Sequence, residues 1–210
     1  MEGRERLRRA VLAGAEAALP EQLELLRSLC SIDCGTGNEA GNAAVRALLR
    51  PALTELGAEI EEIPAPGLGA HLAARVRPAV TPEKRALLCA HLDTVFGEGF
   101  AQKHPFRLDG DWAWGLGAGD CKSGALIALF GALILKRAGL LPPWELNFLF
   151  TCDEEIGSPT GQTVYARFAP GADLALVFEG GREREGKPAF VTSRRGVILG
   201  EIQVEGKEAH

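Results

Sequence analysis

The chain has 210 residues, of which 46% are hydrophobic and 24% are charged, a composition that excludes disordered and fibrous proteins. Its 23 basic and 28 acidic residues give a formal net charge of −5, which disfavours binding to the phosphate backbone of nucleic acids. The longest apolar runs, residues 125–135 and 146–152, are shorter than the roughly 20 residues that cross a bilayer, so we expect a soluble protein without a membrane partner.

The N-terminal segment and the cysteines bear on the cellular compartment. Several arginines precede a weakly apolar stretch, residues 10–19, in the order that a secretion signal would show. Glu16 interrupts this stretch and apolar residues continue at helical spacing as far as Leu29, so we predict an amphipathic helix instead. The five cysteines show none of the paired spacing of a zinc ribbon. We therefore predict reduced thiols and a cytoplasmic location.

Apolar periodicity in the next part of the chain predicts alternating helices and strands. Helical spacing covers residues 40–56, where Pro51 should kink the helix and Gly57 should end it, and recurs over residues 122–138 and 160–168. Strands are predicted at residues 58–63, 71–76, 86–90, 145–152 and 174–178. Strands that alternate with helices indicate an α/β fold with a mainly parallel sheet.

The character of the sequence changes after Gly180. Residues 181–187 are charged and turn-like, whereas residues 189–193 and 197–204 are predicted strands with no helix between them. We predict a boundary that separates a first domain, residues 1–192, from residues 193–210. Because this second segment is too short to bury a core of its own, either a further domain is cut off or the segment packs on the first domain.

Ionisable residues follow three of the predicted buried strands. His91 and Asp93 come directly after the strand at residues 86–90. The other candidates are Asp153, Glu154 and Glu155 after the strand at 145–152, Glu179 after the strand at 174–178, and Asp120 in a glycine-rich loop before a helix. Because ligands bind beyond the carboxyl ends of strands in open α/β sheets, we expect these groups to converge. Carboxylates gathered around an imidazole repel one another unless a cation neutralises them, so the pattern predicts a metal site.

The residue types of this site suggest its metal and its chemistry. Nitrogen and carboxylate ligands without sulfur favour zinc, with cobalt or manganese as substitutes. In an extended chain His91 and Asp93 project to the same side, so Asp93 can accept the second imidazole N–H and orient the ring. Glu154 and Glu155 project differently if their loop stays extended, so one can bind metal while the other acts as a general base. Asp120 can bridge two ions, which stand about 3.5–4 Å apart in co-catalytic sites.

Each of these residues also has an ordinary structural explanation. Taken alone, His91 can be a core histidine and Asp120 the N-cap of the following helix. Glu154 and Glu155 can be a solvated pair in a loop, and Glu179 can belong to a turn. Their joint occurrence at strand and helix ends favours one shared metal site over separate accidents.

Other features of the sequence carry weaker signals. The glycine-rich loop lacks the glycine that a phosphate-binding loop has before Lys122, so nucleotide binding is a minor alternative. His71 and His104 have no carboxylate at useful spacing, and no role is assigned to them. Trp112 and Trp114 are predicted to be packing residues.

Four segments that carry these candidates occur in a fixed order. They are His91-Leu92-Asp93-Thr94-Val95, Gly117-Ala118-Gly119-Asp120-Cys121-Lys122-Ser123-Gly124, Thr151-Cys152-Asp153-Glu154-Glu155-Ile156-Gly157-Ser158 and Phe178-Glu179-Gly180-Gly181. Together they resemble the signature blocks of the co-catalytic zinc metallopeptidases, which include glutamate carboxypeptidase, aminoacylase, acetylornithine deacetylase and succinyl-diaminopimelate desuccinylase. The glutamate carboxypeptidase branch is the most similar, because Ser193-Arg194-Arg195-Gly196 and Gly206-Lys207-Glu208-Ala209-His210 also resemble its next segments.

The resemblance implies a three-layer α/β sandwich with a mainly parallel mixed sheet, followed by the first strands of a truncated α+β lid and dimerisation domain. It implies hydrolysis of an amide bond next to a free carboxylate, in an N-acyl amino acid or dipeptide-like substrate, at a site with two zinc ions. The implied roles are metal binding by His91, Asp120, Glu155 and Glu179, support of His91 by Asp93, general base catalysis by Glu154, and reach of His210 into the partner's active site in a homodimer.

The end of the chain departs from the family pattern. Family members continue through the rest of the lid, which carries an arginine for the substrate carboxylate, and then supply one more histidine ligand. We therefore expect a truncated chain with impaired activity. The alternative is a catalytically inactive metal-binding fragment or an interaction module.

Overall fold

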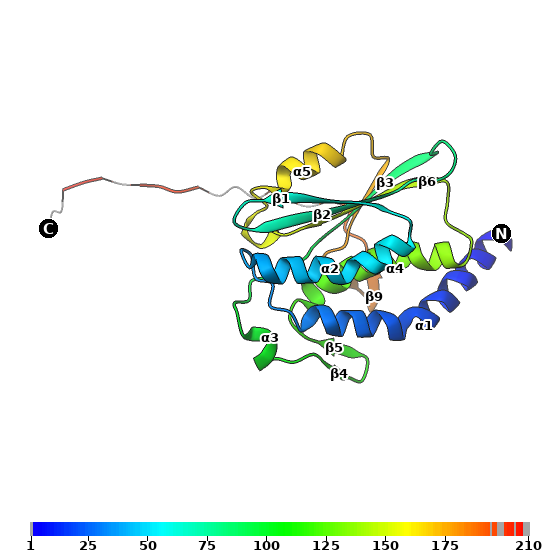
Figure 1. The fold of residues 1–210 in the computed structure, drawn as a ribbon, viewed down its shortest axis with the longest axis horizontal. Coiled ribbons are helices and arrows are strands. Elements are labelled where there is room, and N and C mark those ends of the chain that lie inside the picture. The colour runs from blue at the N-terminus through cyan, green and yellow to red at the C-terminus, as the bar shows by residue number, and fades with distance from the viewer. Residues whose placement is uncertain (1, 194, 197–199, 204, 208–210) are drawn as a thin grey trace. The chain divides into compact units, whose positions relative to one another are not determined.

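We describe the protein from a computed structural model, which covers residues 2–193, 195–196, 200–203 and 205–207. The chain divides into two compact units, residues 1–180 and residues 181–210. The first unit contains a five-stranded sheet and the candidate residues from His91 to Glu179 (Figure 1). The domain division predicted between residues 192 and 193 stays a prediction.

The sheet of the first unit is mixed. Its strands are β1 (Glu59–Ala65), β2 (Gly69–Val76), β3 (Lys84–His91), β6 (Trp144–Thr151) and β7 (Leu174–Val177), in the spatial order β1-β2-β6-β3-β7. β3 pairs in parallel with β6 on one side and with β7 on the other, whereas β1 with β2 and β2 with β6 are antiparallel. The parallel part therefore consists of the three strands that precede the candidate residues.

Helices cover both faces of this sheet. They are α1 (Glu2–Cys30), α2 (Glu39–Glu55) and α4 (Ser123–Arg137) on one face and α5 (Gly161–Phe168) on the other, as Figure 1 shows. Alternation along β3 sends Leu88 and Ala90 into the large core beneath α1, α2 and α4, and Leu87 and Cys89 into the smaller core against α5. The predicted three-layer α/β arrangement is confirmed.

The helices and strands predicted for the first unit agree with the observed ones to within a few residues, except that α1 begins at Glu2, well before the predicted start at residue 10. The predicted end of the second helix also agrees, because Gly57 follows it with a φ of +74°. α2 continues through Pro51 to Glu55. At its start the Asn38 side chain accepts a hydrogen bond from the Gly41 amide.

The most apolar helix of the protein lies in its core. The helical segment Ala118–Arg137 has a mean hydropathy of 1.5 and is long enough to span a membrane by length and composition alone. It is also 67% buried inside the protein, where it contacts α1, α2, β3 and β6. These contacts account for the apolar composition.

Sequence reasoning missed the secondary structure in the long connection between β3 and α4, residues 92–122. This connection holds a one-turn helix, α3 (Phe100–Lys103), and a hairpin of two short strands, β4 (Arg107–Asp109) and β5 (Trp112–Trp114). The prediction that Trp112 and Trp114 are packing residues is wrong, because their exposed fractions are 72% and 50%. The short hairpin leaves both indole rings at the surface.

The second unit contains a hairpin that the sequence reasoning placed incorrectly. Its strands are β8 (Arg182–Arg184) and β9 (Lys187–Ala189), so the strand predicted at residues 189–193 is wrong. Glu185 and Gly186 both have positive φ, 54° and 71°, which is the geometry of a tight two-residue hairpin turn. This turn lies within the charged segment, residues 181–187, that we predicted to be turn-like. The strand predicted at 197–204 lies partly outside the described residues, and residues 200–203 are not in a strand. His210 also lies outside the described residues.

Candidate metal centre

The imidazole of His91 lies at the centre of the predicted acidic cluster. His91 is the last residue of β3 and its side chain is 1% exposed. Its Nε2 atom lies 2.8 Å from Asp120 Oδ1, 3.7 Å from Glu179 Oε2 and 3.9 Å from Glu154 Oε2. The structure therefore brings together side chains that are widely separated in the sequence, as we expected.

The parallel strands explain this convergence. β6 and β7 flank β3, and the carboxyl ends of all three strands meet at one edge of the sheet, where His91 lies opposite Thr151. Glu154 and Glu155 follow β6 in a short helical turn, η2 (Glu154–Ile156), so the extended conformation on which their different projection depended is not observed. Glu179 follows β7 and the intervening Phe178.

Asp120 reaches the site from a helical turn, η1 (Ala118–Lys122), that leads into α4. It does not cap α4, because the N-cap residue is Lys122 and the Asp120 carboxylate instead faces His91. The peptide bond between Asp120 and Cys121 is cis. Lys122 is completely buried, and its ammonium group donates hydrogen bonds to the carbonyl oxygens of Leu29 (2.8 Å) and Ile32 (3.2 Å). These bonds fix η1 against the C-terminus of α1, where a positive charge is favourable.

Asp93 holds the site together in a way that the sequence only partly predicted. We expected its carboxylate to accept the second imidazole N–H, but His91 Nδ1 lies 3.0 Å from the Asp93 carbonyl oxygen and 3.4 Å from Oδ1. The carboxylate accepts the amides of Glu154 and Glu155, each at 3.2 Å, and the hydroxyl of Thr36 at 2.6 Å. Asp93 therefore orients the imidazole mainly through its backbone and positions the two glutamates through its side chain.

A second buried network supports the same turn from the opposite side. Asp153 Oδ2 accepts hydrogen bonds from the amides of Thr160 and Gly161 and from the Thr160 hydroxyl. The Thr160 hydroxyl in turn contacts His71 Nε2 at 2.9 Å, and His71 Nδ1 accepts the Cys152 amide at 3.4 Å. Donors and acceptors match only if Nε2 carries the His71 proton. His71, to which the sequence assigned no role, thus links β2 to the residues before Glu154.

The pKa shifts of the clustered side chains indicate that the cluster favours a cation. Burial lowers the pKa of His91, but its hydrogen bonds with Asp93 and Cys121 and the charge of Glu179 outweigh burial and raise the pKa to about 12. Burial raises the pKa of Glu155 and Glu179, and the charge of Asp120 adds to this effect against the opposing charge of His91. The carboxylates therefore share the one positive charge of the protonated His91 imidazole. A divalent cation could take the place of the proton on this ring.

The ligand atoms in the cluster are arranged compactly enough for a metal ion. Atoms of His91, Asp120 and Glu155 lie within 4.8 Å of one another, and so do atoms of His91, Cys121 and Glu179. Imidazole nitrogen with carboxylate oxygens is a donor set that suits zinc. The Cys121 thiol was absent from the predicted set, although it stands beside Asp120 in the sequence. Its sulfur accepts a hydrogen bond from the His91 amide at 3.3 Å.

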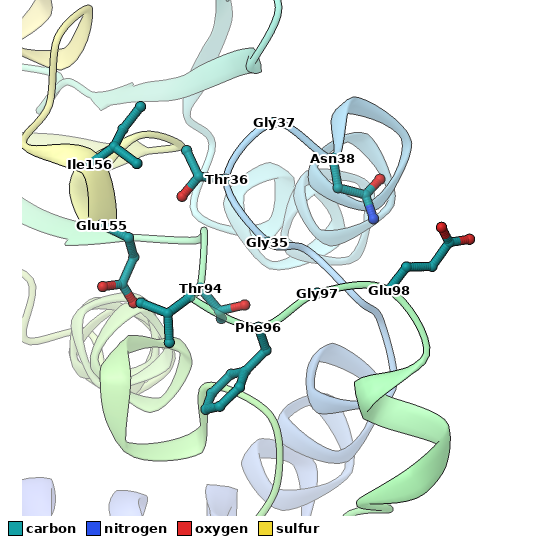
Figure 2. Close-up of a pocket in the computed structure, with 11 residues that line it drawn as sticks. Gly35, Thr36, Gly37, Asn38, Thr94, Phe96, Gly97, Glu98, Glu155 and Ile156 are labelled. Atoms are coloured by element: carbon teal, nitrogen blue, oxygen red, sulfur yellow. The ribbon is translucent and has the colours of Figure 1, made fainter.

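A cavity of about 700 Å³ opens beside the metal ligands. It is lined by residues 35–38, residues 94–98, Glu155 and Ile156. Figure 2 shows Glu155 at one end of this group of residues and Glu98 at the other. The cavity is therefore continuous with the candidate metal centre through Glu155.

Comparisons with known proteins agree with this geometry. Residues 87–207 match the model of peptidase family M20/M25/M40. The chain is 32% identical over 200 residues to carboxypeptidase G2 from Pseudomonas sp. (strain RS-16), which covers 93% of this chain and 47% of that protein. It is also 32% identical over 98 residues to a Beta-Ala-Xaa dipeptidase from Lactobacillus delbrueckii subsp. lactis, which covers 45% of this chain and 20% of that protein.

A solved structure supports the fold. Human carnosine dipeptidase 1 superposes with a TM-score of 0.67 and 18% identity over 80% of this chain and 40% of its own. The chain spans about half the length, or less, of the relatives that it matches. Because the family model matches more than half of the chain and carboxypeptidase G2 aligns with nearly all of it, the chain belongs to peptidase family M20/M25/M40.

Proposed function

We propose that the site around His91 belongs to a two-zinc hydrolase that cleaves an amide bond next to a free carboxylate. The observation that carries this proposal is the buried His91 imidazole with Asp120, Glu154 and Glu179 around its Nε2 atom. The names of two relatives, a carboxypeptidase and a Beta-Ala-Xaa dipeptidase, support an N-acyl amino acid or a dipeptide-like molecule as the substrate.

Four residues would hold the metal, namely His91, Asp120, Glu155 and Glu179. His91, Asp120 and Glu155 form one compact ligand group, and Glu179 shares His91 with a second. The Asp120 side chain is 68% exposed and its Oδ1 lies 2.8 Å from His91 Nε2, and we propose that it would hold both ions. When bound, zinc acts as a Lewis acid and makes hydroxide available near neutral pH.

Glu154 is the proposed general base. Its carboxylate is 45% exposed and lies 3.9 Å from His91 Nε2, so it faces both the ligands and the open side of the site. It would accept a proton from the attacking water and pass this proton to the leaving amine nitrogen. Asp93 holds the Glu154 amide, so the base keeps its place relative to His91.

The test is Glu154→Gln in the purified protein. A general base contributes roughly 10²- to 10⁴-fold, so hydrolysis of an N-acyl-glutamate should fall by that factor. The zinc content, measured by elemental analysis, should stay at the wild-type value, whereas Glu155→Gln should lower it. An unchanged rate in Glu154→Gln would remove Glu154 from the mechanism. Zinc uptake with no hydrolysis by either protein would favour the alternative, a metal-binding module without catalysis.

Three further expectations belong to the same proposal. We propose a homodimer for the intact protein, a cytoplasmic location, and a lid segment that begins near residue 193. Gel filtration with light scattering would test the dimer, and limited proteolysis would test the boundary. A monomer at all concentrations would contradict the first of these.

A further inference from the structure

The cavity beside the metal centre has rigid walls. The Thr36 amide donates to the Thr94 carbonyl at 3.1 Å, and the Thr94 amide donates to the Cys34 carbonyl at 3.1 Å, so the two lining loops pair through their backbones. A side chain at Gly35 would overlap the Phe96 carbonyl, which shows how closely the loops approach. The Asp33 carboxylate accepts the amides of Gly99 and Ala101 and anchors the end of the second loop.

The lining of this cavity is apolar and acidic. Val95 and Ile156 expose 68% and 55% of their surface, an unusual amount for large apolar side chains. Of the eleven lining residues, all within the described part of the chain, the ionisable ones are Glu98 and Glu155. The Thr94 hydroxyl is buried without a hydrogen-bond partner among the described residues, so it adds no accessible polar group to the lining.

The charge of this lining decides which side of a substrate it can accept. A scissile amide divides the substrate into an acyl side and an amine side, and in the proposed reaction the amine side carries the free carboxylate. The cavity begins at the metal ligand Glu155, so one of these two sides enters it. Because Glu155 is neutralised by metal in the proposed site, Glu98 is the remaining charged side chain among the lining residues, and its carboxylate would repel the anionic side.

Resting on the proposed function, we propose that the cavity receives the acyl side of the scissile amide and that Glu98 determines its specificity. The exposed apolar side chains accept the stem of the acyl group. Glu98, at the end of the lining remote from Glu155, attracts a cationic end of that group and rejects an anionic one (Figure 2). The preferred substrates are therefore those with neutral or cationic acyl groups.

The test uses three N-acyl-glutamates whose acyl groups have similar length and different charge. They are 4-aminobutanoyl-glutamate, which is cationic at the acyl end, pentanoyl-glutamate, which is neutral there, and succinyl-glutamate, which is anionic there. Wild-type kcat/KM should fall in that order. An exposed charge pair is worth a factor of about 2 to 5, so Glu98→Gln should reduce the ratio between the cationic and the anionic substrate by about 4- to 25-fold. Glu98→Lys should reverse the order.

Two controls separate charge from other effects. Glu83→Gln makes the same change of net charge at the amino end of β3, on the edge of the sheet away from His91, and should leave the ratio unchanged. The wild-type ratio should also shrink as the salt concentration rises, because exposed charges are screened. A difference caused by shape alone would not depend on salt.

Binding gives a readout that does not need turnover. Calorimetry on the Glu154→Gln variant should show the same order of affinities for the three compounds, and adding Glu98→Gln should reduce the difference. If the compounds are hydrolysed with the same ratio by wild type and Glu98→Gln, the proposed function stands and this inference is overturned. If none is hydrolysed by wild type and none binds the Glu154→Gln variant, the proposed function fails and the inference fails with it.

Discussion

Gly124, the second residue of α4, is the point where that helix touches the strand end that carries Glu179. A Cβ atom on Gly124 would lie 1.9 Å from the carbonyl oxygen of Phe178, and real Cβ contacts are essentially never shorter than 3.0 Å. Gly124→Ala must therefore move the Phe178 backbone or the helix by at least about 1 Å. Because Phe178 directly precedes Glu179, the displacement moves a proposed metal ligand away from His91.

The effect of Gly124→Ala on the stability of the protein has two opposing contributions. Alanine is favoured over glycine inside a helix by about 0.5–1 kcal/mol, whereas overpacking of a tight contact costs about 1–3 kcal/mol. Gly131 lies in the same helix, and a Cβ there would meet nothing within 4 Å. Gly131→Ala should therefore stabilise the protein. The helix contribution cancels in the comparison, so Gly124→Ala should be less stable than Gly131→Ala by about 1–3 kcal/mol.

Urea unfolding of the two alanine variants measures this difference in stability. Competition for zinc with a chelator measures the zinc affinity of the site. Gly124→Ala should bind zinc at least about 10-fold more weakly than wild type, since small shifts in the groups that hold metal ligands cost 10- to 100-fold in affinity. Gly131→Ala should bind zinc as wild type does. Equal stability and equal zinc affinity of the two variants would refute the contact between α4 and the Glu179 segment.

Two further substitutions test the buried contacts that fix the site. Lys122→Met leaves the Ile32 carbonyl without the donor that Lys122 supplies and removes one of two donors to the Leu29 carbonyl, so it should cost about 1–3 kcal/mol in urea unfolding. Lys136→Met, which removes a similar bond to a carbonyl at the exposed end of α2, should change stability by less than about 0.5 kcal/mol, and equal costs would contradict the capping role of Lys122. Thr160→Val breaks the chain between His71 and Asp153 and should cost about 2 kcal/mol, whereas Thr163→Val on the exposed side of α5 should be within about 0.5 kcal/mol of wild type. A loss no larger than that of Thr163→Val would show that the His71 network contributes nothing.

The fold was predictable where one physical preference governs a whole segment. The continuous apolar run of β3 and the long periodic pattern of α4 both specify buried elements, and both occur close to their predicted bounds. The hairpin at β8 and β9 was missed because its turn depends on two positive φ values in a charged stretch rather than on an Asn-Gly or Asp-Gly pair. The exposure of Trp112 shows the same limit, because an aromatic residue type does not say whether anything covers it.

The convergence of the candidate metal ligands was predictable because the sheet topology places most of them at one edge. Once β3, β6 and β7 are recognised as parallel neighbours, the residues that follow them must meet at one edge of the sheet, and His91 and Glu179 do. The groups that hold these ligands were not predictable in this way. Thr36, which donates a hydrogen bond to Asp93, lies in the loop before α2. Only the packing of that loop in the structure shows that Asp93 is its partner.

Lys122 illustrates why such supporting residues escape a reading of the sequence. A lysine in a glycine-rich loop suggests phosphate binding, and its position one residue before α4 gives no sign of burial. Its function follows from the end of α1, where its ammonium group donates to the Ile32 carbonyl and joins the Ile32 amide as a donor to the Leu29 carbonyl. One ammonium group contacts both carbonyls and holds the loop of Asp120 in place. The requirement arises in one part of the sequence and is met in another, so neither part alone could have revealed it.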